Sequence, residues 1–239
     1  MSDDKQVYFS PGNLQAVCTS ADGDASTQET WTWQFAANQW DYIGNVAANN
    51  SIDGNGSTSA AGIVDLFGWS SSNTYFGIGG SSAIDYYHDN FADWGRNVIG
   101  SYAADTWRTL TTAEWTYLFN TRTVNGGTGE GYSYTLGKSI NGKLGIVFYP
   151  DNYTGSEYAG SNWSTFEAAG CVFLPTAGWR KPDGTFDYIG ELGRYWSSTD
   201  YGSYSPQTYL IGIWSSSVNL NDYSTRNNGH SVRLIHDAN

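Results

Sequence analysis

Aromatic side chains interleaved with turn residues dominate this sequence. It contains 11 Trp, 18 Tyr and 29 Gly, whereas Asp, Glu, Lys and Arg together make up only 14% of the chain. Long amphipathic helices rely on Lys, Glu, Leu and Ala, so we do not expect them here. The buried area must instead come largely from aromatic rings on short elements. This pattern predicts a loop-rich α+β fold with antiparallel strands and two short helices.

Several segments have the alternation or the turn residues of antiparallel strands. In VYFSPGNLQAV, residues 7–17, the triplet Pro-Gly-Asn is a turn, a bulge or an interruption of the strand. In YTLGKSINGKLGIVFYP, Asn141 and Gly142 suit a type I′ turn between two strands. Further strands are expected at residues 30–36, 171–180, 193–199, 208–214 and 231–235, and a loop at residues 49–62.

The first helix is expected from Thr111 to Thr121. Thr111 precedes Glu114 by three positions, which is the spacing of a capping box at a helix N-terminus. Apolar residues then recur at i, i+3 and i+4, so that one face of the helix can pack on a core, namely Trp115, Leu118 and Phe119.

The second helix is expected from Ser164 to Ala169. Ser164 and Glu167 have the same capping-box spacing, and Gly170 suits a C-terminal stop. Both helices are short, in agreement with the composition.

Most tryptophans are expected in the core, because a chain this poor in Lys has little else to fill its centre. A sugar-stacking role at the surface is the alternative for these rings. The residues concerned are Trp31, Trp33, Trp69, Trp107, Trp115, Trp179 and Trp196. For Trp214, the sequence does not decide between a place in the core and one at the surface.

The charge of the chain argues against two classes of partner. A formal net charge of -12 would repel phosphate, and no basic stripe is present, so we expect neither nucleic acid nor an anionic membrane surface. No apolar run approaches the roughly 20 residues that span a bilayer, so membrane insertion is not expected. The start, MSDDKQVYF, lacks the apolar stretch of a secretion signal, which a longer precursor could have carried.

No catalytic or metal-binding constellation is recognisable, and we expect no enzyme activity, no metal and no cofactor. His88, His230 and His236 have no partner at metal-ligand spacing. Cys18 and Cys171 allow one disulfide at most and fit no zinc or redox motif. Whether the two cysteines pair is left open.

A run of short polar side chains directly precedes the last expected strand, SVRLI. In that strand Val232 and Leu234 share one face and Arg233 takes the other. Residues 219–230 before it are mostly Asn, Asp, Ser, Thr and Tyr, which cannot bury a face. The run is therefore either an ordinary solvated loop or a surface kept for contact with a ligand.

Three ordered motifs resemble a known family. They are LPTAGWR at residues 174–180, GRYWSST at 193–199 and NNGHSVRLI at 227–235. Together they resemble the C-terminal region of bacterial C-type-lectin-fold proteins, specifically the variable proteins of diversity-generating retroelements and the related paralogous surface-domain family. PGNLQ and DLFGW, nearer the N-terminus, are similar to the same family. The resemblance implies one C-type-lectin-like domain over residues 1–239, with the last strand paired to an early one and a variable ligand-binding region at about 194–235.

Two other activities occur on that fold, and their motifs are not reproduced here. Formylglycine-generating enzymes use a close cysteine pair, which the two distant cysteines do not match. Sugar-binding lectins coordinate calcium through Glu-Pro-Asn or Gln-Pro-Asp together with Trp-Asn-Asp, whereas this chain has YPDN at 149–152 and KPDG at 181–184. Asp151 or Asp183 could still ligate an ion by another geometry.

The resemblance also implies a restricted residue alphabet. In these systems a reverse transcriptase copies a template RNA with errors at adenines, and the copy replaces the end of the gene. Changing the adenines of an AAC or AAT codon reaches Asn, Ser, Thr, Tyr, His, Asp, Gly and others, but never Lys, Glu, Gln, Met, Trp or a stop. Residues 200–231 contain no Lys, Glu or Met. Gln207 and Trp214 lie outside the alphabet, so they are either fixed positions or come from other codons.

The residues expected to contact the partner belong to that alphabet and lie between the fixed motifs. Alternation places Leu210 and Gly212 on one side of a strand and Ile211 and Ile213 on the inner side, so the isoleucines are excluded, as is Val218. Arg226, between two polar runs, is expected to be a fixed anchor. The predicted ligand-binding residues are Tyr201, Ser203, Tyr204, Ser205, Thr208, Leu210, Gly212, Ser216, Ser217, Asn219, Asn221, Asp222, Tyr223, Ser224, Asn227, Asn228 and His230.

The sequence thus predicts a binding protein displayed at the cell surface or outside the cell, either secreted or anchored as a lipoprotein. Its partner would be a protein or another surface ligand, and the chain itself a monomer. Tyr should carry most of the affinity, because it offers large amphipathic contacts at low entropy cost. The alternative is a structural or adhesive surface domain that is not diversified, and a fold-sharing enzyme is a third possibility.

Overall fold

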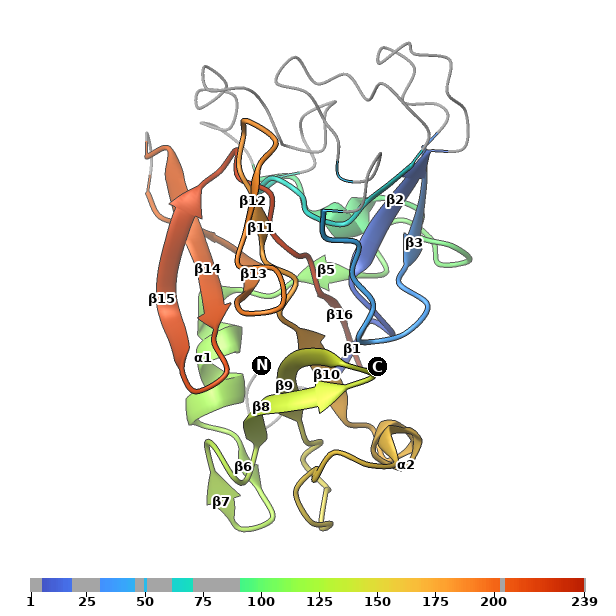
Figure 1. The fold of residues 1–239 in the computed structure, drawn as a ribbon, viewed down its shortest axis with the longest axis vertical. Coiled ribbons are helices and arrows are strands. Elements are labelled where there is room, and N and C mark those ends of the chain that lie inside the picture. The colour runs from blue at the N-terminus through green and yellow to red at the C-terminus, as the bar shows by residue number, and fades with distance from the viewer. Residues whose placement is uncertain are drawn as a thin grey trace.

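The computed structural model describes residues 6–18, 31–45, 50, 62–70, 91–202 and 205–238. In these residues the chain is a mixed α+β structure, in which two helices accompany antiparallel strands, as the sequence predicts (Figure 1). None of the helices found there has both the length and the apolar character needed to cross a bilayer. The loop expected at 49–62 lies outside the described residues apart from its two end regions, Asn50 and Gly62.

The first and last strands of the described chain pair with each other. β1 (Val7–Phe9) lies antiparallel to β16 (Leu234–Asp237), and β5 (Arg108–Thr109) lies on the other side of β16. The expected pairing of the last strand with an early one is therefore confirmed. The regular strand begins later than expected, because the Val232 carbonyl instead accepts a hydrogen bond from the Leu14 amide at 2.9 Å.

A second sheet follows the Pro-Gly-Asn interruption. β2 (Leu14–Cys18) lies at its centre, between β3 (Trp31–Phe35) and β4 (Gly62–Val64). A Cβ atom on Gly12 would lie 2.5 Å from the Ala36 carbonyl oxygen, so the interruption requires glycine at this close approach.

A third sheet contains the predicted hairpin. β8 (Tyr134–Ile140) and β9 (Lys143–Phe148) meet at Asn141 and Gly142, whose φ angles of 49° and 75° confirm a turn with both central residues left-handed. β10 (Val172–Pro175) completes this sheet. The remaining short elements are η3 (Trp94–Arg96), β6 (Thr123–Val124) with β7 (Gly127–Thr128), and β11 (Trp179–Arg180) with β12 (Phe186–Asp187).

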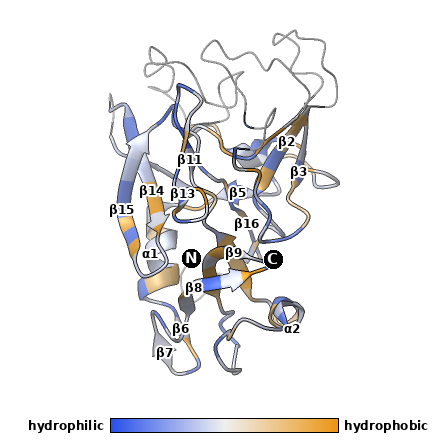
Figure 2. Ribbon diagram, viewed as in Figure 1, coloured by the Kyte–Doolittle hydropathy of each residue, from blue (hydrophilic) through white to orange (hydrophobic). Residues whose placement is uncertain are grey.

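The C-terminal sheet has the order β13-β14-β15. Its strands are β13 (Gly193–Asp200), β14 (Gln207–Ile213) and β15 (Val218–Thr225), and α1 (Thr112–Asn120) packs against all three. β13 and β14 were predicted, but β15 was not. Most of β15 is hydrophilic, with apolar positions near its start (Figure 2).

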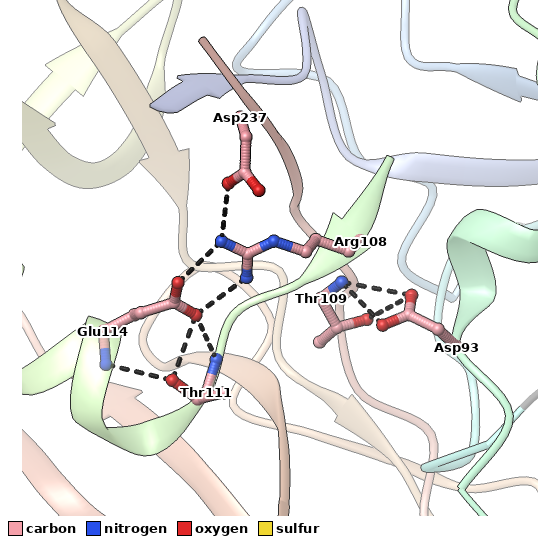
Figure 3. A network of polar contacts seen from close by, with 6 residues as sticks. All are labelled: Asp93, Arg108, Thr109, Thr111, Glu114 and Asp237. Atoms are coloured by element: carbon pink, nitrogen blue, oxygen red, sulfur yellow. Dashed lines mark hydrogen bonds and ion pairs between the residues drawn. The ribbon is translucent and has the colours of Figure 1, made fainter. Parts of the chain in front are cut away.

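The N-terminus of α1 has the predicted capping box. The Thr111 hydroxyl accepts a hydrogen bond from the Glu114 amide at 3.2 Å, and the Glu114 carboxylate accepts one from the Thr111 amide at 2.9 Å. Arg108 then binds Glu114 with both of its terminal nitrogens and reaches Asp237 with one of them, at 2.9 Å (Figure 3). The cap of α1 is thus joined to β5 and β16.

The second helix exists, but its predicted capping box does not. α2 (Trp163–Ala168) starts after Asn162, which has a left-handed conformation and makes no side-chain cap. The Glu167 carboxylate accepts a hydrogen bond from Gln39 at 2.9 Å rather than from the start of its own helix. The stop at Gly170 is confirmed by its φ of 87°.

Three apolar clusters form the core, and β14 lies between two of them. Leu210 packs with the cluster around Trp69, Trp94 and Trp196, whereas Ile211 and Ile213 pack with α1. Of the predicted core tryptophans, four are buried, namely Trp69, Trp107, Trp115 and Trp196. Trp33 and Trp179 are half-buried, and the side chain of Trp31 lies outside the described atoms.

Candidate ligand-binding surface

The hairpin of β14 and β15 carries most of the predicted contact residues. β15 is an edge strand, which pairs only with β14 in the described part of the chain. Asn219, Asn221 and Tyr223 are exposed on it, and the residues between them are half-buried. The pairing register shifts between Leu210 and Gly212, so the strand is irregular at its middle.

Three tyrosines form an aromatic patch at one end of this hairpin. The ring of Tyr201 lies 4.9 Å from that of Tyr209 and 5.6 Å from that of Tyr223, measured between centroids. Tyr209 and Tyr223 are direct partners in the strand register. Tyr201 is 44% and Tyr223 48% exposed, so the patch offers aromatic surface that the fold itself does not bury.

The other end of the hairpin borders a hollow of about 370 Å³. Four predicted contact residues line it, namely Ser216, Ser217, Asn219 and Asn221. Its opposite wall comes from the end of α1 and from the segment that leads into β8, with Glu130 and Tyr134. In the turn between β14 and β15, Trp214 is 37% exposed and its ring lies 5.4 Å from that of Tyr188.

Side chains of β15 occupy two of its own backbone donors. The Asn219 side-chain oxygen accepts a hydrogen bond from the Asn221 amide at 3.1 Å, and Asp222 accepts one from the Tyr223 amide at 3.0 Å. The Asp222 carboxylate also pairs with Arg194 at 3.2 Å. These bonds fix the strand locally without adding another strand to the sheet.

Seven predicted contact residues are buried. They are Thr208, Leu210, Gly212, Ser224, Asn227, Asn228 and His230. The expectation that Leu210 and Gly212 face outward is wrong, because both faces of β14 are covered by core clusters. A partner can reach these positions only if the fold rearranges.

The polar run before the last strand also packs, contrary to expectation. The Arg226 guanidinium lies 4.5 Å from the centre of the Trp69 ring and pairs with Asp200, and only 1% of Arg226 is exposed. The Trp69 amide donates a hydrogen bond to the Arg226 carbonyl at 3.0 Å. Arg226 is thus buried and joined to Trp69 and Asp200, and its role as a fixed anchor stays a prediction.

His230 belongs to the same buried segment. Its ring lies 4.5 Å from that of Trp196 and 5.7 Å from that of Trp179, between centroids. Burial, and secondarily the charge of Arg194, hold the pKa of His230 well below its usual value, so its imidazole is neutral. Its backbone amide and carbonyl pair with Phe67. His230 therefore supports the fold.

The predicted contact residues that remain accessible cluster on the hairpin and just before it. Tyr201, Ser216, Ser217, Asn219, Asn221 and Tyr223 are exposed, and Ser205 and Asp222 are half-buried. Ser203 and Tyr204 lie outside the described residues. The prediction omitted Tyr209, although this residue belongs to the reachable alphabet and lies between the fixed motifs.

The two aspartates considered as possible ion ligands have partners within the fold, and Cys171 is buried. Asp151 pairs with Arg122 at 3.0 Å, and Asp183 accepts hydrogen bonds from Thr185. Burial raises the pKa of the free Cys171 thiol to about 12, so it is protonated at neutral pH. In the described part of the chain, no three His, Cys, Asp or Glu side chains gather where a metal ion could bind. His88 lies outside that part.

No family model, no curated protein and no solved structure matches this chain. Its function must therefore be inferred from its own residues and their geometry.

Proposed function

We propose that this protein is a binding module without catalytic activity, which displays a variable contact surface on a C-type-lectin-like fold. The observation that carries the proposal is the patch of Tyr201, Tyr209 and Tyr223, together with the exposed polar residues of β15. Large rings rimmed by small polar groups are the composition of binding surfaces that must adapt to a protein partner.

The composition of the exposed surface supports its diversification. Tyr201, Ser216, Ser217, Asn219, Asn221 and Tyr223 are exposed and belong to the alphabet that adenine-directed mutagenesis reaches, whereas the exposed Trp214 does not. Buried groups such as Arg226 hold the segment from beneath. Substitutions at the exposed positions would therefore change contacts with a partner and leave most of the packing unaltered.

The pairing of the first and last strands supports the C-type-lectin-like assignment, because the resemblance implies that arrangement. The same proposal places the protein outside the cell or on its surface, as a monomer that binds a protein or another surface ligand. Its net charge of -12 is unfavourable for nucleic acid.

A paired substitution tests the site. Tyr201→Ala with Tyr223→Ala should weaken binding to a partner selected from a displayed protein library by at least about thirtyfold, because one aromatic hot spot contributes about 2 kcal/mol or more. The melting temperature should change little, since both rings are about half exposed. Tyr8→Ala with Tyr132→Ala removes two rings elsewhere that are at least as exposed, and this pair is the matched control.

Two results would contradict this site. Equal loss of binding in the control pair would mean that the patch is not the contact surface, and collapse of the fold in the test pair would mean that the rings are core. The genetic part of the proposal has its own test. A near-copy of the end of the gene, differing only at template adenines, is expected downstream; without such a copy the adhesive alternative is favoured.

A further inference from the structure

The hollow beside the hairpin of β14 and β15 is lined by one acidic side chain. Its described lining residues include Glu130, whose side chain is exposed, and no Lys or Arg. The pKa of the Tyr134 hydroxyl is raised first by burial and then by the charge of Glu130, which places this carboxylate near the phenol. A positively charged group would find an unshared carboxylate here, at the edge of the hollow.

The end of α1 adds to the negative potential. α1 ends at Asn120, and both Phe119 and Asn120 line the hollow. The last turn of this nine-residue helix contains no basic residue. The carbonyl end of a helix favours a nearby cation.

Aromatic rings and neutral acceptors complete the lining. Tyr134 is half-buried, so part of it stays accessible, whereas Phe119 is only 1% exposed and packs edge to face against Tyr134, with 4.8 Å between the ring centroids. Ring faces attract organic cations. The opposite wall offers side-chain oxygens that can accept hydrogen bonds, from Ser216, Ser217, Asn219 and Asn221. A single carboxylate suits an organic cation better than a metal ion, which needs several charged or oxygen ligands.

We propose that this hollow receives a lysine or arginine side chain of the partner protein. The inference rests on the proposed function, because four of the lining residues belong to the predicted contact surface. It assigns the two ends of the hairpin different tasks: the tyrosine patch contributes apolar area, and the hollow selects a basic residue. The net charge of -12 favours the approach of such a partner.

The test uses small probes, so that it does not depend on finding the partner. N-acetyl-arginine amide is titrated into the isotope-labelled protein, and the side-chain amide signals of Asn219 and Asn221 are followed by NMR. We expect saturable shifts with a millimolar dissociation constant. N-acetyl-citrulline amide has the same shape without the charge and should bind at least about tenfold more weakly. Glu130→Gln should weaken binding of the arginine probe to a similar degree.

Glu157→Gln is the matched control, because Glu157 is an exposed glutamate that lines a different hollow. This variant should leave the arginine titration unchanged. The proposal is overturned if no saturable shift occurs, if citrulline binds equally well, or if Glu130→Gln has no effect. Self-association that Glu130→Gln abolishes would show that a second copy fills the hollow. None of these results depends on Tyr201 or Tyr223, so failure here is distinguishable from failure of the tyrosine patch.

Discussion

The guanidinium of Arg226 stacks on Trp69 and pairs with Asp200, while its carbonyl accepts the Trp69 amide. A long polar segment can therefore be fixed to the core through one side chain, whose stem and planar head are both buried. Asp200 stays 41% exposed on its side chain, so most of the stabilisation should come from stacking and hydrogen bonding.

Arg226→Ala should lower the free energy of unfolding by about 2 kcal/mol, through the lost ring contact and hydrogen bonds. Urea denaturation measures this change. Arg96→Ala removes an exposed arginine, and its free energy of unfolding should stay within about 0.5 kcal/mol of that of the parent. If the two variants are equally stable, Arg226 is not an anchor.

Because Asp65 is a buried carboxyl group, we expect the stability of the protein to depend on pH in an unusual way. It accepts hydrogen bonds from Asn50 at 2.8 Å and from the Ile43 amide at 2.7 Å, yet burial raises its pKa from 3.8 to about 6. An acid whose pKa is raised in the folded state favours folding while protonated. This contribution is complete below the unfolded pKa and is lost as the pH rises through the folded pKa.

Relative to Asp65→Asn, which cannot ionise, the free energy of unfolding of the parent should fall by about 2 kcal/mol between pH 4 and pH 7. Urea denaturation at several pH values gives both curves. Asp105→Asn replaces an exposed aspartate, and its curve of unfolding free energy against pH should run parallel to that of the parent. Parallel curves for the parent and Asp65→Asn would show that folding does not raise the pKa of Asp65.

The two helices differ in how their first turns are stabilised, and this difference can be measured. Thr111→Ala removes the hydroxyl that caps α1 and should cost about 1 kcal/mol of unfolding free energy. Ser164→Ala in α2 is the matched control, because the cap of α2 has no side-chain hydrogen bond. Thermal denaturation of both variants decides the point. Equal destabilisation would mean that the α1 capping box contributes nothing specific.

The elements that could be predicted are those whose cause is local in sequence. The α1 cap and the turn at Asn141 and Gly142 each depend on residues a few positions apart, and both are confirmed. The cap of α2 was predicted wrongly, because Glu167 is engaged by Gln39, which is distant in sequence. β15 was missed because its polar composition hides the apolar positions near its start.

The same distinction holds for the candidate site. The restricted alphabet correctly predicts that Tyr223, Asn219 and Asn221 are exposed, but it does not predict that the residues from Arg226 to Ser231 are buried. That burial depends on partners such as Trp69 and Phe67, more than a hundred positions earlier in the chain. A single sequence contains no direct signal for contacts over such a separation.

Across the described chain, β14 connects the main packing regions. Leu210 belongs to the cluster under the N-terminal sheet, and Ile211 and Ile213 belong to the cluster under α1. The pairing of β1 with β16 brings the first and last strands into the same structure. β14 thus packs on two apolar clusters, and under the proposed function partner contacts would vary along β15 while β14 stays packed.

The bonds that Asn219 and Asp222 make to the amides of β15 also affect behaviour in concentrated solution. An open strand edge tends to recruit a strand from another molecule, and such recruitment leads to fibres. Here two amides of the edge strand are already occupied from within. Edge-to-edge joining of two copies of the chain is thereby disfavoured. A substitution at 219 that removes the side-chain acceptor would lose one of these bonds, and the variant should tolerate crowding less well.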